Sequence, residues 1–332
     1  MPSPPRMSKI LLLDEVASTE NLWSAFRECS RGKRSKLGYQ RFFFGVGERL
    51  VDMQRRLLAG TYAWQGYREF VVKDPKARVI MAAPFSDRVI HHAIHRVIEP
   101  LFDPLLSERT YACRKGKGSS RAVLDLWASL RSYGKQRYVV KLDVESYFAS
   151  VSHDLLLKSL LATLPDPSLD AILTSLVRTS HAGCASAGKG IPIGNLTSQL
   201  FANWMLNPAD RFIENEYPQV RHFRYMDDIV ILARSKKDAL DCAHAVVKFA
   251  AEVLSLCIPF TKMNPLASDP VPFLGYLLNH DGYSVLARNR GRFQKHVRRL
   301  RQRGCRESRV AQALLAHEAW TLVPEGGRRP QG

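Results

Sequence analysis

The spacing of apolar residues along the chain predicts alternating helices and short strands. In residues 87–101, apolar side chains fall at 89/90, 93/94, 97/98 and 101, which matches the 3.6-residue period of an amphipathic helix. Runs rich in β-branched and aromatic residues at 137–143, 222–225 and 229–233 predict strands. The last two runs flank residues 226–228, an arrangement typical of a hairpin.

Helices and turns fill the segments between these strands. Residues 1–72 predict helices interrupted by a loop at 31–38, and residues 73–83 predict a turn followed by a strand. The other expected elements are a leucine-rich helix opened by Ser152 and Asp154 and broken at 165–167, a loop at 188–194, a helix from about Asn195 that Pro208 ends or kinks, a helix at 238–256 and a short strand at 273–276. The order β-α-(loop)-α-β-β-α-β predicts an α+β sheet with helices on one face.

The composition indicates a folded protein with room for two or three subdomains. Of the 332 residues, 45% are hydrophobic, which provides a core and excludes disorder as the main state. No apolar run approaches the roughly eighteen residues that span a bilayer, so we expect no membrane partner. The N-terminal residues make a poor secretory signal, and none of the six cysteines forms a CxxC pair. We therefore expect a cytoplasmic protein without a zinc ribbon or a disulfide framework.

The excess of positive charge indicates a polyanionic partner. The chain has 49 Lys plus Arg, 31 Asp plus Glu and a formal charge of +18. Basic residues concentrate at 27–41, 109–121 and 288–309, and in the last stretch Phe293, Val297 and Leu300 give one helix face an apolar stripe. Each stretch alone would be typical of a solvated surface, whereas all three together favour a groove that binds a nucleic-acid backbone. The expected contacts in the last stretch are Arg288, Arg292, Lys295, Arg298, Arg299 and Arg301.

Two histidines raise the alternative of a zinc site. His91 and His95 lie four residues apart on the predicted helix at 87–101. The sequence has no HExxH pattern and no obvious third ligand. A structural or RNA-facing role is therefore the expected one.

Three acids point to a metal site. Asp143 ends a hydrophobic strand, and Asp227 and Asp228 lie side by side at the predicted hairpin. Adjacent acids reach one site only if the backbone turns between or beside them. Clustered carboxylates repel one another, and divalent cations remove that repulsion while clamping the oxygens of a phosphoryl transfer. An Asp-Asp pair alone would be typical of a polar turn, but the strands on both sides and the upstream Asp143 favour catalysis.

Several motifs together resemble reverse transcriptases. Tyr225-Met226-Asp227-Asp228 resembles their YxDD box, and residues 141–148 (KLDVESYF) resemble their first catalytic strand. Further matches are Ala77-Arg78-Val79-Ile80 with Pro84 and Asp87-Arg88, Tyr111-Ala112-Cys113-Arg114-Lys115-Gly116, and Lys262 before Phe273-Leu274-Gly275-Tyr276. The resemblance runs from about residue 73 to 276 with the motifs in the family's order.

The resemblance implies a fold, a cofactor and a set of roles. The fold would be an α+β right-hand polymerase, with N-terminal helices and fingers at 1–136, a palm of antiparallel sheet plus helices at 137–279 and a short basic helical thumb at 280–332. Two Mg²⁺ ions would be held by the three aspartates and a backbone carbonyl near Val144. Phe148 would be the steric gate against a ribose 2′-hydroxyl. Arg78 and Arg114 would contact the triphosphate or the template, and Lys262 the leaving pyrophosphate.

A loop motif suggests a subfamily. Residues 193–199 read IGxxxSQ, with Ile193, Gly194 and Gln199 at the defining positions, where group II intron enzymes usually show QGxxxSP. This pattern resembles the reverse transcriptases of diversity-generating retroelements, bacterial and phage systems that copy a template RNA with errors at adenines. The partners would be template RNA, a cDNA primer and product, dNTPs and a small helical accessory protein.

Other classes of protein remain as alternatives. Within the family, a bacterial defence-type or group II-like reverse transcriptase would be similar in length. A two-metal nuclease would use the same three acids but would give Phe148 no purpose. A non-catalytic RNA-binding protein would explain the charge of +18 but not the converging acids.

Overall fold

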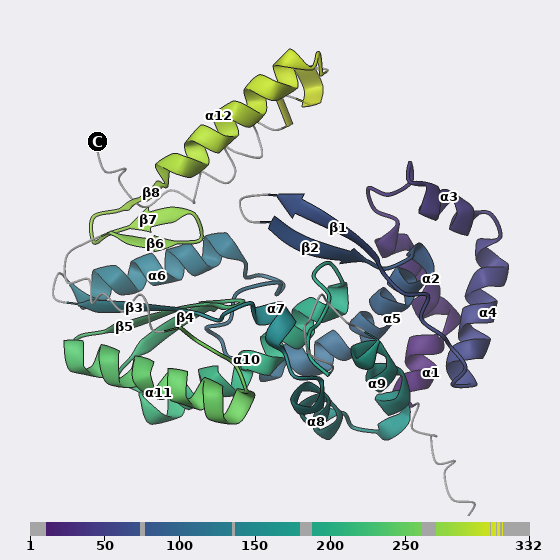
Figure 1. Ribbon diagram of the computed structural model, residues 1–332, viewed down its shortest axis with the longest axis horizontal. Coiled ribbons are helices and arrows are strands. Elements are labelled where there is room, and N and C mark those ends of the chain that lie inside the picture. The colour runs from purple at the N-terminus through teal and green to yellow at the C-terminus, as the bar shows by residue number, and fades with distance from the viewer. Residues whose placement is uncertain are drawn as a thin grey trace, which may run out of the picture. The chain divides into compact units, whose positions relative to one another are not determined.

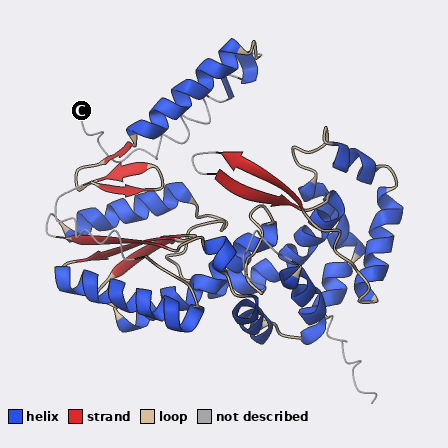
Figure 2. Cartoon of the chain, viewed as in Figure 1, coloured by secondary structure: helices blue, strands red, loops and turns tan. Residues whose placement is uncertain are grey.

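The computed structural model describes most of the chain. The described residues are 11–73, 77–134, 137–179, 188–259, 270–305, 307–309, 311–312 and 314. Their backbone forms helices and three antiparallel sheets, and the fold class is α+β as predicted (Figure 2). No helix in these ranges is both long enough and apolar enough to cross a bilayer.

Two compact units divide the chain, and each is discontinuous in sequence. The first unit comprises Met1–Leu106, Glu145–Pro208 and Ala251–Leu256. The second comprises Ser107–Val144, Ala209–Ala250 and Cys257–Gly332.

The first unit is mainly helical (Figure 1). Its elements are α1 (Leu12–Ala17), α2 (Thr19–Cys29), α3 (Leu37–Phe43), α4 (Val46–Leu58), β1 (Arg68–Lys73), β2 (Ala77–Ala82), α5 (Phe85–Phe102), η1 (Asp103–Leu105), α7 (Tyr147–Ser150), α8 (His153–Thr163), η2 (Pro167–Leu169), α9 (Asp170–Arg178) and the first part of α10 (Leu196–Glu216).

Helix α5 forms the centre of the first unit. Val89, Ile90, Ala93, Ile94 and Ile98 lie on its inner face and are completely buried, which confirms the predicted amphipathic helix. The amide of Asn21 on α2 donates to the carbonyl oxygens of Val16 (3.1 Å) and Ala93 (3.0 Å). A buried polar side chain therefore fixes α1 and α2 to α5 without an unsatisfied donor.

Asp87 at the start of α5 anchors the preceding loop. Its carboxylate accepts from the hydroxyl of Tyr62 (2.6 Å) and from the backbone amide of Gln65 (2.9 Å). Burial, the larger effect, raises the pKa of Asp87 above its ordinary value, and these two hydrogen bonds oppose the rise. The Asp of the predicted fingers motif is thus engaged in holding the chain that leads into β1.

The second unit is built around a three-stranded sheet with the order β3-β5-β4. Its elements are α6 (Ser119–Tyr133), β3 (Tyr138–Asp143), the rest of α10, β4 (Arg221–Tyr225), β5 (Asp228–Ala233), most of α11 (Lys236–Leu254), β6 (Val271–Phe273), β7 (Tyr276–Leu278), β8 (Tyr283–Val285) and α12 (Ala287–Gln302). The pairings between these strands are antiparallel, and an isolated parallel bridge joins Thr110 to Arg224 of β4.

The sheet is covered on both faces, which corrects the prediction of helices on one face. Val139, Phe223, Val230 and Leu232 share a core cluster with α6 and with strands β6 and β7. Ile229, Ile231 and Ala233 alternate with these residues along β5 and are also completely buried. Figure 1 shows α6 on one side of the sheet and α11 on the other. A central strand buried on both faces explains the nearly continuous apolar run at 229–233.

Three further elements differ from their predictions. Residues 68–73 form strand β1 instead of ending a helical region, and all six are exposed, so no alternation of buried positions revealed the strand. Of the two predicted effects of Pro208, ending the helix is wrong: α10 continues to Glu216 and buries Asp210 and Ile213 beyond the proline. Residues 273–276 form a hairpin turn between β6 and β7 rather than one strand, with Leu274 and Gly275 at φ +47° and +90°.

Candidate active site

Asp143 and Asp228 lie directly opposite each other on neighbouring strands. They are the last register pair of β3 and β5, at the end where β5 begins. Side chains of directly opposed residues on an antiparallel pair have Cβ atoms about 5 Å apart. Asp143 is exposed and Asp228 is half-buried, so two carboxylates face one accessible position at the sheet edge.

Asp227 belongs to the turn that immediately precedes Asp228. Tyr225 pairs with Asp228, so the β4–β5 hairpin has only Met226 and Asp227 in its loop. The prediction placed Asp228 in the turn as well, whereas it is the first residue of β5. Met226 has φ +55°, in the left-handed region that residues other than glycine rarely adopt. The backbone turns beside the acid pair, as a shared site for adjacent acids requires.

Lys141 supplies positive charge beside this pair. It lies two residues before Asp143 on β3, and its Nζ lies 3.3 Å from each carboxylate oxygen of Asp228. Burial, the largest effect, raises the pKa of Asp228 above its ordinary value, Lys141 opposes the rise, and the charge of Asp143 adds to it. The two aspartates therefore repel each other, as expected for carboxylates that share a site for a cation.

A buried ion-pair network holds the turn, and sequence reasoning missed it. Arg224 on β4 is completely buried, and its guanidinium bonds Asp210 of α10 through Nη2–Oδ2 (2.6 Å) and Nε–Oδ1 (2.9 Å). Nη2 also donates to Thr110 Oγ1 (2.9 Å), and Nη1 donates to the carbonyl oxygen of Met226 (3.2 Å). The arginine therefore ties the strained residue of the turn to α10 and to the segment around Thr110.

Asp210 is the buried anion of that network. Thr110 Oγ1 donates to its Oδ2 (2.8 Å), and Nε2 of His222 lies 3.2 Å from Oδ1. Burial raises the pKa of Asp210, but the charge of Arg224 and the interaction with His222 outweigh burial, so the pKa lies below its ordinary value. The one available signal in the sequence was the spacing of His222 and Arg224, which lie two residues apart and so on the same face of the predicted strand.

The acids are suited to a hard divalent cation. Carboxylate oxygens are the ligands that Mg²⁺ prefers, and a cation would relieve the repulsion between Asp143 and Asp228. Across the described ranges, no group of three or more His, Cys, Asp or Glu side chains is already assembled as a metal centre. Asp143, Asp228 and the adjacent Asp227 thus fit a metal site whose ligands would come together when the ion binds.

Phe148 and the loop before α10 lie together in the first unit. The carbonyl oxygen of Phe148 on α7 accepts from the backbone amide of Ile191 (2.8 Å). Two residues on, the carbonyl oxygen of Ile193 accepts from the amide of Met81 on β2 (3.3 Å). Gly194 has φ +120°, and a Cβ there would lie 3.4 Å from the Met81 carbonyl oxygen, which explains why glycine follows Ile193. The predicted steric gate and the subfamily loop are thus joined through backbone contacts.

The other predicted site residues differ in their position and in their contacts. Nη1 of Arg114 donates to the carbonyl oxygens of Ser107 (2.7 Å) and Thr110 (3.1 Å), which gives this side chain a structural role. Arg78 pairs with Val72 in the β1–β2 ladder, Val144 is buried just after β3, and Gln199 is half-buried on α10. Lys262 lies outside the described residues.

Helix α12 has the division of faces that its sequence predicts. Val297 and Leu300 are buried in a small cluster with Phe293 and Cys305. The basic residues expected to bind nucleic acid are all exposed, namely Arg288, Arg292, Lys295, Arg298, Arg299 and Arg301.

The structural role expected for His91 agrees with its surroundings. His91 is buried on α5, and its ring centroid lies 5.2 Å from that of Trp64. Burial, followed by the nearby charges of His92 and Arg88, lowers the pKa of His91 to about 3. The ring is therefore neutral at physiological pH and belongs to the packed interior.

The fold and the site together define a class of enzyme. An antiparallel sheet that presents paired carboxylates at one strand end, with a third acid in an adjoining tight turn, suits metal-assisted phosphoryl transfer, the chemistry that polymerases and nucleases share. Residues 72–278 match the sequence profile of the family described as reverse transcriptase (RNA-dependent DNA polymerase). The match covers more than half of the chain, so the chain belongs to the reverse transcriptase family, whose enzymes are RNA-directed DNA polymerases.

Individual relatives agree with the family assignment. Protein YkfC of Escherichia coli is 24% identical over 270 residues, which cover 69% of this chain and 71% of YkfC. The group II intron-encoded protein LtrA of Lactococcus lactis is 22% identical over 172 residues, 50% of this chain but only 28% of LtrA. The apo telomerase of Candida tropicalis, truncated from its C-terminal domain, has a TM-score of 0.51 at 12% identity, over 67% of this chain and 55% of that one, and so shares the fold.

Proposed function

We propose that this chain copies RNA into DNA by transferring nucleotides from dNTPs to the 3′-hydroxyl of a primer. The observation that carries the proposal is the cross-strand pair of Asp143 and Asp228, with Asp227 in the adjoining turn, in a chain of charge +18. A non-catalytic RNA-binding protein has no need to bring like charges together against their repulsion.

In this proposal each residue near the pair has a task. The three aspartates and the carbonyl oxygen of Val144 would hold two Mg²⁺ ions, which supply charge to the attacking and leaving oxygens when bound. Lys141 limits the repulsion at Asp228, and Arg224 fixes the turn that presents Asp227. The template sequence would be read by base pairing. The exposed basic face of α12 would therefore contact only the phosphate backbone and the 2′-hydroxyls of the RNA.

A primer-extension assay on a defined RNA template tests this function. Extension that requires both dNTPs and Mg²⁺ is the expected result. Shortening of the primer or template without extension would instead identify a two-metal nuclease. Tight RNA binding with neither reaction would identify a non-catalytic RNA-binding protein.

We further propose that the enzyme is the error-prone reverse transcriptase of a bacterial or phage diversity-generating retroelement. The loop 193–199, with Ile193 where the group II relatives usually place Gln, supports this role. In the cytoplasm the enzyme would act in mutagenic retrohoming with template RNA, a cDNA primer and a small helical accessory protein. A defence-type or group II-like role is the alternative within the family.

Ile193→Gln tests the retroelement role. A Gln can hydrogen-bond beside the nascent base pair, whereas Ile193 offers only apolar contact, which discriminates weakly. One such bond contributes on the order of 1 kcal/mol, a several-fold effect. We expect the substitution to lower misincorporation several-fold, most of all opposite template adenine, at some loss of rate. Sequencing of cDNA made on one defined RNA measures this, with Ile193→Val as the control.

The wild-type error pattern can contradict the retroelement role directly. If wild-type errors are rare and evenly spread over the four template bases, this role is wrong. The reverse transcriptase function would survive that result, because it depends on the acids rather than on the loop.

Phe148→Ala tests sugar selection. If the ring excludes a ribose 2′-hydroxyl, its removal admits ribonucleotides, and we expect the ratio of ATP to dATP incorporation to rise at least about tenfold. Single-nucleotide incorporation measures the ratio. Phe148→Tyr keeps the ring and should keep the selection, while an unchanged ratio in Phe148→Ala would make Phe148 an ordinary packing residue.

Neutralising part of α12 tests the nucleic-acid-binding role of that helix. Replacing Arg298, Arg299 and Arg301 by Gln removes three exposed charges while keeping the buried Val297 and Leu300. We expect weaker RNA binding and a salt dependence flattened by up to about three phosphate contacts. The control replaces three exposed basic residues just before and at the start of α11, namely Arg234, Lys236 and Lys237. If wild type and the α12 variant have equal salt slopes, α12 does not contact the nucleic acid.

A further inference from the structure

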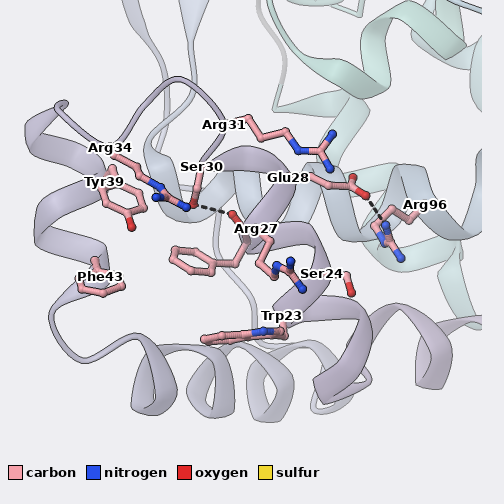
Figure 3. Close-up of a pocket in the computed structure, with 11 residues that line it drawn as sticks. Trp23, Ser24, Arg27, Glu28, Ser30, Arg31, Arg34, Tyr39, Phe43 and Arg96 are labelled. Atoms are coloured by element: carbon pink, nitrogen blue, oxygen red, sulfur yellow. Dashed lines mark hydrogen bonds and ion pairs between the residues drawn. The ribbon is translucent and has the colours of Figure 1, made fainter.

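A pocket of about 720 Å³ lies among the N-terminal helices of the first unit, and the proposed catalysis does not use it (Figure 3). Its volume is in the range of small-ligand sites, about 300–1,000 Å³. The lining combines exposed aromatic rings with four arginines, and we call it the arginine–aromatic pocket. Its residues are Trp23, Ser24, Phe26, Arg27, Glu28, Ser30, Arg31, Arg34, Tyr39, Phe43 and Arg96.

The aromatic side chains form a continuous wall. The ring centroids of Phe26 and Tyr39 are 6.0 Å apart and those of Tyr39 and Phe43 are 5.5 Å apart, with interplanar angles of 10° and 21°. Trp23 extends the wall, with its ring centroid 5.6 Å from that of Phe26. Phe26 is buried, but Trp23 and Phe43 remain 44% and 49% exposed. A large aromatic ring left half open to solvent at each end of a stack offers a surface on which a further planar group can stack.

Positive charge in the pocket exceeds negative charge. The one acid, Glu28, forms an ion pair with Arg96, whose Nε also donates to Asn21 Oδ1 (2.9 Å). The other three arginines are Arg27, Arg31 and Arg34, and all are exposed. Within the described ranges, no acid lies within ion-pair distance of any of the three. Three guanidinium groups are therefore available to an anion beside the aromatic wall.

Local structure explains how these groups come to share one pocket. Trp23 and Arg27 are four residues apart on α2 and so lie on the same helix face. Helix α2 ends at Cys29, and the turn that follows passes through Gly32 at φ +66° before α3 begins at Leu37. This turn carries Arg31 and Arg34, and α3 then supplies Tyr39 and Phe43.

We propose that the arginine–aromatic pocket binds a stretch of single-stranded RNA, with one base stacked on Trp23 and the neighbouring phosphates held by the three arginines. Unpaired bases stack on aromatic rings and arginine planes, while a duplex keeps its bases out of reach. An acidic peptide would match the charge but would leave the open rings without a planar partner. The proposal takes from the family only that its members use an RNA template.

The aromatic part is tested by direct binding of an unpaired RNA of about ten nucleotides, without Mg²⁺ or dNTPs. We expect Trp23→Ala to weaken binding about tenfold, because stacking one base on an aromatic ring raises affinity from about fivefold to about a hundredfold. Trp23→Phe keeps a ring and should restore most of the affinity. Phe44→Ala is the matched control, since Phe44 is exposed but does not line the pocket. Unchanged binding by Trp23→Ala, or an equal loss in Phe44→Ala, would overturn the proposal.

The charged part is tested by two triple variants from the same segment of the chain. One replaces Arg27, Arg31 and Arg34 by Gln, and the other replaces Lys33, Lys36 and Arg41, which are exposed and lie outside the pocket. Each removes three charges, so any general electrostatic effect is matched. We expect the pocket variant to flatten the log–log salt slope by about 2, at about 0.7 for each phosphate of a single strand, and the control to change it less. Equal changes would show a diffuse basic surface instead of a site.

Competition and crosslinking identify the ligand and its place. Photo-crosslinking of the bound RNA should label the peptide that carries Trp23 or the one that carries Tyr39. Duplex RNA and polyglutamate should compete poorly at equal charge. If polyglutamate displaces the RNA from these peptides, the pocket binds an acidic protein instead. If duplex RNA displaces it, base stacking is excluded. These measurements involve no nucleotide addition, so their failure and the failure of the proposed polymerase activity are distinguishable.

Discussion

Asp227→Asn is expected to abolish nucleotide addition while the fold persists. The substitution keeps the size and the hydrogen-bonding oxygen of the side chain but removes the charge needed to hold Mg²⁺ beside Asp143 and Asp228. Removing one electrostatic group from an active site slows catalysis by at least about 10²–10³-fold. We expect a loss of that size or greater in primer extension. Asp227 lies in an accessible turn outside the packed core, so the unfolding midpoint should remain close to that of the wild type.

The control and a second readout make this prediction specific. Asp241→Asn removes an exposed charge from α11 and should leave primer extension unchanged. Mg²⁺ binds only the native site, so it should raise the unfolding temperature of the wild type more than that of Asp227→Asn. Near wild-type extension by purified Asp227→Asn would place the catalytic metals elsewhere.

Arg224→Met is expected to lower the free energy of unfolding by about 3–5 kcal/mol. The substitution leaves Asp210 buried without its cation, and breaking a buried ion pair from one side has this cost. It also removes the hydrogen bond to the Met226 carbonyl oxygen, so the turn carrying Asp227 loses its restraint. Urea unfolding measures the loss of stability. Primer extension below the denaturation midpoint measures the loss of alignment.

A double variant separates the buried charge from the restraint on the turn. Arg224→Met with Asp210→Leu removes both charges and should recover much of the lost stability, as paired apolar replacements of buried ion pairs do. The turn would still lack its bond, so activity should remain low. Full recovery of activity would show that Arg224 contributes to stability alone.

The pH dependence of stability follows from the lowered pKa of Asp210. A carboxylate whose folded pKa lies below its unfolded value stabilises the protein above the unfolded pKa of about 4. That contribution disappears as the pH falls through the folded value. The stability difference between wild type and the double variant should therefore narrow on acidification, measured by urea unfolding at a series of pH values.

The sequence predicted the parts of the fold that depend on local pattern. The helix at 87–101 has a clear 3.6-residue period, the strands at 137–143 and 229–233 are runs rich in β-branched residues, and the structure confirms all three with ends shifted by one or two residues. The sequence also predicted that Asp143 and Asp228 share a site, because each acid adjoins an apolar strand, but it placed Asp228 in the turn and so did not predict the cross-strand pair. Strand β1 was missed because all of its side chains are exposed, and local propensity cannot show that it pairs with β2.

The network behind the active site could not be predicted from local pattern. Arg224 is 114 residues from Thr110 and 14 from Asp210, and no sequence period connects them. The place of Asp210 on a buried helix could not be predicted, because a proline normally ends a helix and α10 instead continues through Pro208. Tertiary burial of Asp210 and Ile213 stabilises the second part of that helix against the local preference.

The hydrogen bond from Arg224 to Met226 has a consequence for how the protein folds. The two-residue turn is local and can form early, but its left-handed residue is restrained only when α10 and the segment around Thr110 have reached Arg224. Closing so long a loop is slow and entropically costly. A nascent chain can therefore form the hairpin before it has a rigid catalytic turn. Nucleotide addition therefore requires the long-range contacts of Arg224 with Thr110 and Asp210, so a half-folded copy that binds RNA but lacks them would be unable to extend a primer.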